Sequence, residues 1–138
     1  MAHAGVVLIN KKGEVLMQHR DNNPDIINPD HWAYIAGQKE DNDENYEQTA
    51  RRELQEETGY VADKLYPLLE EDFVRPDGVK ARRHIFWAIY DDRQKINCFE
   101  GQEIVFIKLE ELEQKKILPD HKRICYLAVQ EAKKKGLI

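Results

Sequence analysis

The stretch GQKEDNDENYEQTARRELQEETGY, residues 37–60, changes the periodicity of the chain from strand-like to helical. Tyr46, Ala50 and Leu54 are spaced by four, which places their side chains on one face of a helix. Gly59 follows this run at a position where glycine commonly ends a helix, because glycine adopts the left-handed conformation without strain. The stretch therefore predicts a helix over residues 45–58 with one buried face.

Three glutamates share another face of this helix. Glu53, Glu56 and Glu57 have the i, i+3, i+4 spacing of helical neighbours, and like charges at that spacing destabilise an isolated helix. A solvated surface face is the ordinary explanation of such a run. A divalent cation gives the cluster a function, because Mg²⁺ prefers oxygen ligands and is often bound by a few carboxylates together with substrate phosphates.

Length and composition indicate one globular domain over residues 1–138. Apolar residues make up 41% of the chain and charged residues 34%, which is typical of a protein with a packed core. The formal charge is −5, so bulk attraction to a nucleic-acid backbone is not expected. An acidic protein that acts on phosphates needs metal ions between its own carboxylates and the phosphate groups. We expect its partner to be a small molecule.

The two cysteines and the N-terminal segment indicate the cellular compartment of the protein. Cys98 and Cys125 form no C-x-x-C pair, and we expect both to be buried thiols in a reducing compartment. The segment MAHAGVVLIN has no basic region and only a short apolar run, so it predicts no signal peptide. No stretch is long enough to span a membrane, and we expect the protein to be cytoplasmic. We expect it to be a monomer or a homodimer.

Strand-like segments lie on both sides of the predicted helix. Strands are predicted at residues 4–9, 15–20, 32–37, 65–74, 81–92 and 103–109, and helical segments at 109–118 and from residue 120 onward. A polar loop with two prolines occupies residues 21–31. This order of strands, helix, strands and helix predicts a mixed sheet between helices, an α/β/α sandwich.

Residues 37–60 resemble the Nudix box, G-x5-E-x7-R-E-U-x-E-E-x-G-U, in which U is a bulky aliphatic residue. The matching residues are Glu44, Arg52, Glu53, Leu54, Glu56, Glu57 and Gly59, with the aromatic Tyr60 at the last apolar position. The likeness extends to the strand order and the closing helix, and it is greatest to compact MutT-type members. The opening glycine of the box falls on Gln38, one place after Gly37, and a positive φ there would strain Gln38 by about 1 kcal/mol.

The resemblance implies Mg²⁺-dependent hydrolysis, with Mn²⁺ as a substitute, of a nucleoside diphosphate linked to another group. The short chain favours a (deoxy)nucleoside triphosphate. The implied metal ligands are the Gly37 carbonyl, Glu53, Glu56, Glu57 and Glu100, with Glu44 and Arg52 orienting the site. The general base is Glu100 or Glu53, and an ordinary loop role for Glu100, with Glu103 as its rival, stays open.

Substrate contacts and a second class of function remain as alternatives. Arg20 and Lys39 are candidates for binding phosphate, although either could be a surface cation, and Asp120 could cap the last helix or bind a base edge. The cluster at residues 82–84 is interpreted as a solvated strand end. The departure at Gln38 also allows a non-catalytic nucleotide-binding or regulatory module.

Overall fold

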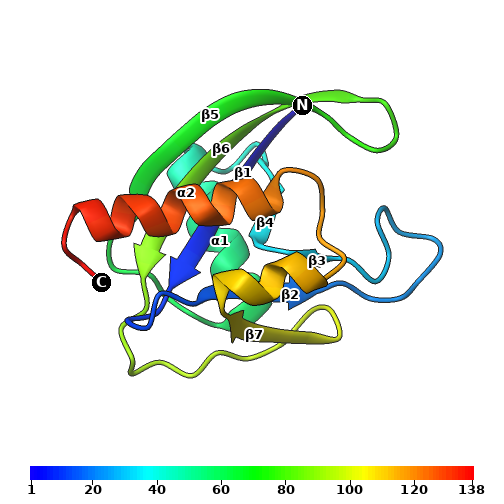
Figure 1. The fold of residues 1–138 in the computed structure, drawn as a ribbon. Helices are drawn as coiled ribbons and strands as arrows, with labels where there is room; N and C mark the ends of the chain where they lie inside the picture. The colour runs from blue at the N-terminus through cyan, green and yellow to red at the C-terminus, as the bar shows by residue number, and fades with distance from the viewer.

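A computed structural model describes residues 1–138 as a mixed β-sheet packed between helices (Figure 1). Its strands are β1 (Ala2–Ile9), β2 (Val15–His19), β3 (Trp32–Ala33), β4 (Ile35–Gln38), β5 (Tyr66–Val74), β6 (Lys80–Ile89) and β7 (Glu103–Ile107). The order is β3-β2-β1-β6-β5, with β4 also pairing with β1 and β7 with β2. Only the β1–β6 pair is parallel.

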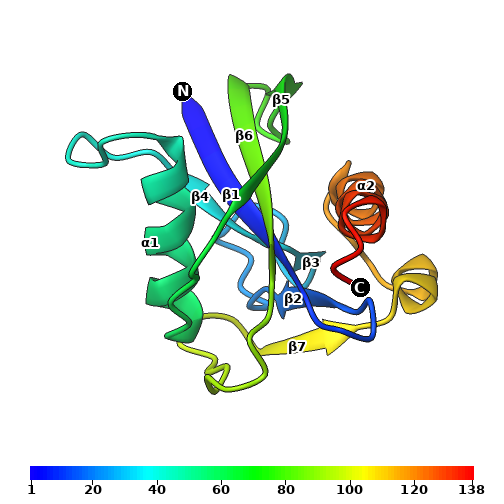
Figure 2. The same ribbon diagram turned by 90° about the vertical axis from the view of Figure 1, so that its left-hand side faces the viewer.

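Helices cover both faces of this sheet. The helix α1 (Tyr46–Thr58) lies on one face, whereas α2 (His121–Lys134) and the short 3-10 helix η1 (Leu109–Gln114) lie on the other (Figure 2). Neither α1 nor α2 combines the length and the hydropathy that a membrane span requires. The predicted α/β/α sandwich is confirmed.

The central strand β1 supplies both halves of the core, because successive side chains of a strand point to opposite faces. Val6 and Leu8 pack on the α1 side with Leu54. Val7 and Ile9 pack on the α2 side, where small residues of that helix approach the sheet closely. A strand buried on both faces shows a continuous apolar run instead of alternation, as residues 6–9 do.

Two expectations differ from the structure. The single strand predicted over residues 32–37 is divided at Tyr34, because β3 pairs with β2 while β4 crosses to pair with β1. The expectation that both cysteines are buried is correct for Cys125 and wrong for Cys98. Cys98 is exposed because it lies on the loop that passes over the C-terminal end of α1, where main-chain hydrogen bonds hold the loop.

Candidate active site

Both ends of α1 are capped, and the Gly59 end is the one that the sequence predicts. The Asn45 side chain caps the helix by accepting a hydrogen bond from the main-chain N–H of Gln48 at 2.8 Å. Gly59 has a φ of 80° and closes the last turn. Ala50 and Leu54 are fully buried against the sheet, so the glutamates are carried on the flanks of the helix.

Gly37 in β4 and Glu53 in α1 approach so closely that no side chain fits between them. A Cβ atom built on Gly37 would overlap the carboxyl group of Glu53. Gln38, at the position of the missing box glycine, has no positive φ and ends β4 with its side chain exposed. The glycine that this site requires is therefore Gly37, and Gln38 is unstrained.

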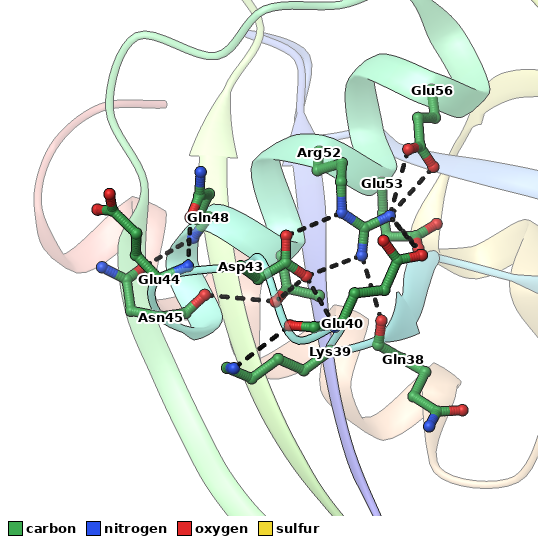
Figure 3. Close-up of polar contacts among 11 residues, drawn as sticks. Gln38, Lys39, Glu40, Asp43, Glu44, Asn45, Gln48, Arg52, Glu53 and Glu56 are labelled. Atoms are coloured by element: carbon green, nitrogen blue, oxygen red, sulfur yellow. Dashed lines mark hydrogen bonds and ion pairs between the residues drawn. The ribbon is translucent and has the colours of Figure 1, made fainter.

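Arg52 connects α1 to the loop before it (Figure 3). Its Nε and Nη2 donate to the two carboxylate oxygens of Asp43 at 3.0 and 2.9 Å. Its Nη1 donates to Glu53 at 3.1 Å and to Glu56 at 3.2 Å, and its Nη2 reaches the Gln38 carbonyl at 3.2 Å. One guanidinium thus orients two of the three clustered glutamates.

Asp43, and not Glu44, is the acidic partner of Arg52. Asp43 is 5% exposed and also accepts hydrogen bonds from the Glu40 main chain and the Thr49 hydroxyl. The hydrogen bonds from Arg52 hold the pKa of the Asp43 carboxyl well below its usual range. The Glu44 carboxylate is exposed, points away from Arg52 in Figure 3 and makes no ion pair. Asp43 was not among the residues predicted from the sequence, although it directly precedes the expected Glu44.

Glu57 is the most deeply buried carboxylate of the cluster. It is 6% exposed, its Oε1 accepts a hydrogen bond from Gln18 at 3.3 Å, and its Oε2 has no partner. Burial, followed by the charges of Glu53 and Glu100, raises the pKa of Glu57 to about 9. Burial also raises the pKa of Glu53 to about 7. These carboxylates cannot all be ionised at neutral pH without a compensating positive charge.

The loop before β7 brings Glu100 beside this pair. The main-chain N–H of Phe99 donates to the Glu57 carbonyl at 3.0 Å, and Gln18 donates to the Glu100 carbonyl at 3.0 Å. Glu103, the alternative to Glu100, begins β7 opposite His19 and is exposed. The structure therefore brings Glu100 to the α1 cluster, as the sequence predicts.

The donor set suits a hard divalent cation. No three His, Cys, Asp or Glu side chains converge on one point, and Glu56 lies 57% exposed beside Arg52. Glu57 nevertheless presents a buried oxygen without a partner, and the lack of a side chain on Gly37 lets the Glu53 carboxyl lie directly against β4. Carboxylate and carbonyl oxygens at this position match the ligand preference of Mg²⁺.

A cavity of about 380 Å³ opens next to these residues, and Gly37 and Gln38 form part of its wall. No aspartate or glutamate lines this cavity, whereas Arg20, Arg75 and Arg83 do. The rest of the wall includes aromatic and apolar side chains, among them Tyr34, Phe73, Ile85 and His121. In a protein with a net charge of −5, this wall is a locally basic surface suited to a ligand rich in hydrogen-bond acceptors.

Arg83 is the buried cation of the cavity. It is 5% exposed, its guanidinium carbon lies 3.9 Å from the centre of the Phe73 ring, and its Nε and Nη1 have no hydrogen-bond partner. Glu71 and Asp120 approach it at 3.9 and 4.0 Å. The interpretation of residues 82–84 as a solvated strand end is correct for Arg82 and wrong for Arg83 and His84, which are buried. Strand alternation places Arg83 on the α2 face and Arg82 on the opposite one, and that alternation was the available signal.

The three predicted substrate-binding residues are separated. Arg20 lines the cavity and donates to the carbonyls of Ile27 and Asn28 at 2.7 and 3.2 Å. Lys39 lies in a shallow depression with Glu53, and its ammonium contacts the Glu40 carbonyl at 3.4 Å. Asp120 stands at the N-cap of α2, but its side chain makes no capping hydrogen bond. It pairs with Arg123 at 3.6 Å instead.

Comparison with known proteins identifies the family and the fold. A family model described as the NUDIX domain matches residues 1–128. The NUDIX domain of NrtR from Shewanella oneidensis, complexed with ADP ribose, superposes with a TM-score of 0.78 at 20% identity, over 100% of this chain and 88% of that one. A MutT protein from Methanosarcina mazei gives 0.78 at 20% identity, with 96% and 95% covered. An Ap4A hydrolase from C. elegans gives 0.75 at 20% identity, with 98% of each chain covered.

Proposed function

The chain belongs to the Nudix hydrolase family, and on that premise we propose that it is a Mg²⁺-dependent pyrophosphohydrolase acting on a nucleoside diphosphate linked to another group. The preferred substrates are (deoxy)nucleoside triphosphates, and Mn²⁺ substitutes for Mg²⁺. The observation that carries the proposal is the approach of Glu53, Glu57 and Glu100 to one another beside Gly37, next to a cavity without acidic side chains.

The carboxylates have separate roles in this proposal. Glu53, Glu57 and Glu100 would hold the cation with the Gly37 carbonyl, and Glu56 would join from the outer side. When bound, the cation neutralises charge on the non-bridging phosphate oxygens. Arg52 keeps Glu53 oriented, and Asp43 in turn holds Arg52 in place through two hydrogen bonds. The orienting role expected of Glu44 thus passes to Asp43.

The chemical step is hydrolysis of a pyrophosphate linkage. A water molecule gives a proton to Glu53 or Glu100, its oxygen forms a bond to phosphorus, and the bond from that phosphorus to the bridging oxygen breaks. The leaving phosphate takes the electron pair of the broken bond. Either carboxylate can accept this proton only in its ionised form, and a divalent cation held beside it would favour that form.

The nucleoside would occupy the 380 Å³ cavity, whose wall includes Gly37 on the side of the carboxylates. Arg83 offers unpartnered N–H groups inside it, and a guanidinium pairs well with the two acceptors on a guanine edge. Arg20 and Lys39 would meet phosphate oxygens, and Asp120, which does not line the cavity, would support Arg83 from behind. A free small-molecule nucleotide is therefore the proposed partner.

A panel of nucleotides incubated with Mg²⁺, with products weighed by mass spectrometry, tests the proposal. The panel holds guanine and adenine triphosphates, nucleotide sugars, ADP-ribose and dinucleoside polyphosphates, and Glu57→Gln is assayed beside the wild type. We expect cleavage by the wild type and a loss of at least about 100-fold in the variant, because it removes a metal-binding oxygen. Its unfolding temperature should not fall, since Glu57 Oε2 has no partner to lose. Wild-type turnover in Glu57→Gln contradicts the proposal.

A nucleotide-binding module without catalysis is the second candidate. The solved complex of an NrtR NUDIX domain with ADP ribose has the same fold as this chain. The buried carboxylate cluster favours the enzyme, because a module that only binds has no need of a like-charged cluster that destabilises the fold. Tight nucleotide binding with no Mg²⁺- or Mn²⁺-dependent product in the panel would select the binding module.

A further inference from the structure

Gln18 is a buried amide in the middle of an apolar strand. It follows Val15, Leu16 and Met17 in β2 and is 5% exposed. Its main chain is paired on both sides, with Ala33 in β3 and Ile104 in β7. A buried amide costs free energy unless its hydrogen-bonding groups find partners, so its contacts indicate what it does.

The amide nitrogen of Gln18 contacts two groups that belong to different elements. It lies 3.3 Å from Oε1 of Glu57 in α1 and 3.0 Å from the main-chain carbonyl of Glu100 in the loop before β7. Both neighbours are acceptors, so the NH₂ group must face them, and its two hydrogens are then both used. Gln18 is the only residue that donates a hydrogen bond to the Glu57 carboxylate.

The Glu100 loop is fitted tightly against the same strand. The main-chain N–H of Gln102 donates to the His19 carbonyl at 2.7 Å. Gly101 has a φ of 90°, and a Cβ there would lie 2.7 Å from that carbonyl and 3.0 Å from Cγ of Gln18. The main-chain N–H of Phe99 also donates to the Glu57 carbonyl at 3.0 Å, so main-chain hydrogen bonds and the Gln18 amide together hold the Glu100 main chain beside Glu57.

A neutral donor suits this position. A lysine or arginine at this position would place a permanent positive charge beside Glu57. That charge would compete with a metal cation for the Glu57 carboxylate. The neutral Gln18 amide orients the Glu57 carboxylate without neutralising its charge, which stays available to a metal cation. Arg52 performs the charged version of this task for Glu53 and Glu56, on the outer side of the cluster.

We propose that Gln18 is a positioning residue that fixes the Glu57 carboxylate and the Glu100 loop relative to each other, so that both present oxygens to one divalent cation. The inference rests on the proposed function. Gln18 also lines the 380 Å³ cavity, so cation affinity measured without substrate is the readout that separates its positioning role from any contact with the nucleotide. Its loss should lower cation affinity and turnover.

The test uses Gln18→Met, which keeps an unbranched side chain of similar length and removes both donors. Gln94 supplies a matched control, because its Nε2 also donates to one carbonyl, that of Val61, and to one carboxylate, that of Asp91, each at 2.8 Å. Free Mn²⁺ is measured by electron paramagnetic resonance without substrate, and kcat, KM and the unfolding temperature are determined separately. Gln18→Asn, which keeps an amide but withdraws it by one methylene, is the second variant in case the first does not fold.

We expect Gln18→Met and Gln18→Asn to raise the Kd for Mn²⁺, measured without substrate, and to lower kcat, each by about 10–100-fold. Gln94→Met should change neither quantity. Wild-type Mn²⁺ affinity in both Gln18 variants overturns the inference, as does an equal loss in Gln94→Met. If the wild type binds Mn²⁺ but cleaves nothing in the panel, the proposed activity fails while the Mn²⁺ comparison still decides the role of Gln18. A wild type that binds no Mn²⁺ overturns both.

Discussion

At the scale of single residues, Arg83 shows how one side chain can give a pocket its chemical character. It is buried on the face of Phe73 with two nitrogens unpartnered, in a cavity without acidic lining residues. Its neighbour Arg82 projects to the opposite side of β6 and pairs with Asp72 at 3.0 Å near the surface. The two adjacent arginines therefore allow a comparison of buried and exposed charge at almost the same place in the chain.

We expect Arg83→Met to raise KM for the cleaved nucleotide by at least about tenfold and to change kcat by less than about threefold. The variant keeps an unbranched apolar stem on Phe73 but loses charged hydrogen bonds to substrate, and each of these contributes about 1.5–3 kcal/mol. Steady-state kinetics on the substrate found in the panel measure both constants. Arg82→Met should behave as wild type, and equal KM values for the two variants would remove Arg83 from the binding site.

At the scale of elements, the loop before α1 is attached to the helix by one ion-pair network. Asp43 binds the guanidinium of Arg52 with both oxygens and also accepts from Thr49 in the first turn of the helix. The helix and the loop therefore move together, and the position of Glu53 depends on a residue ten places earlier in the chain.

We expect Asp43→Ala to lower kcat by about tenfold or more and to lower the unfolding temperature, since Arg52 loses its principal partner and Glu53 its fixed orientation. Asp41→Ala is the control, because Asp41 lies in the same loop, is exposed and makes no side-chain hydrogen bond. Kinetics and thermal unfolding of the two variants provide the comparison. A loss that is equal at both positions would indicate a general effect of the loop and not of the network.

The regular elements could be predicted from sequence, whereas the residues that hold the site together could not. Apolar spacing and the glycine at 59 define α1 because these signals are local. Asp43 and Gln18 have partners 9 and 39 residues away, and nothing within their own segments indicates those distances. The crossing at Tyr34 likewise depends on which strand lies next to which.

At the scale of the whole molecule, the attachment of α2 to the sheet gives stability a dependence on pH. The first residue of α2, His121, stacks on Tyr34 at 3.8 Å, and its Nδ1 accepts a hydrogen bond from the Tyr34 main chain at 3.2 Å. Burial, followed by the charges of Arg83 and Arg20, lowers the pKa of His121 from 6.5 to about 3. The folded protein therefore holds this imidazole neutral where the unfolded chain would protonate it.

The sign of the effect follows from proton linkage. The contribution of His121 to stability is complete above pH 6.5 and is lost as pH falls from 6.5 towards about 3. Each pH unit in that window shifts the unfolding equilibrium by up to about tenfold for one proton. We expect His121→Asn to be less stable than wild type at pH 7 and to lose less stability between pH 6.5 and 4. Urea denaturation midpoints between pH 4 and 7 measure this change of stability, with His31→Asn as the control. If the midpoints of His121→Asn and wild type change with pH in parallel, the prediction is wrong.

The parallel pairing of β1 with β6 has a consequence for how the protein is made. Residues 2–9 are synthesised about 80 residues before their partners, residues 82–89. Until β6 is made, one edge of β1 has no neighbour, and pairings between distant segments form slowly. The growing chain must therefore keep the apolar run of residues 6–9 from associating with other chains until β6 is synthesised. We expect these residues to be the main site at which the nascent chain needs a chaperone.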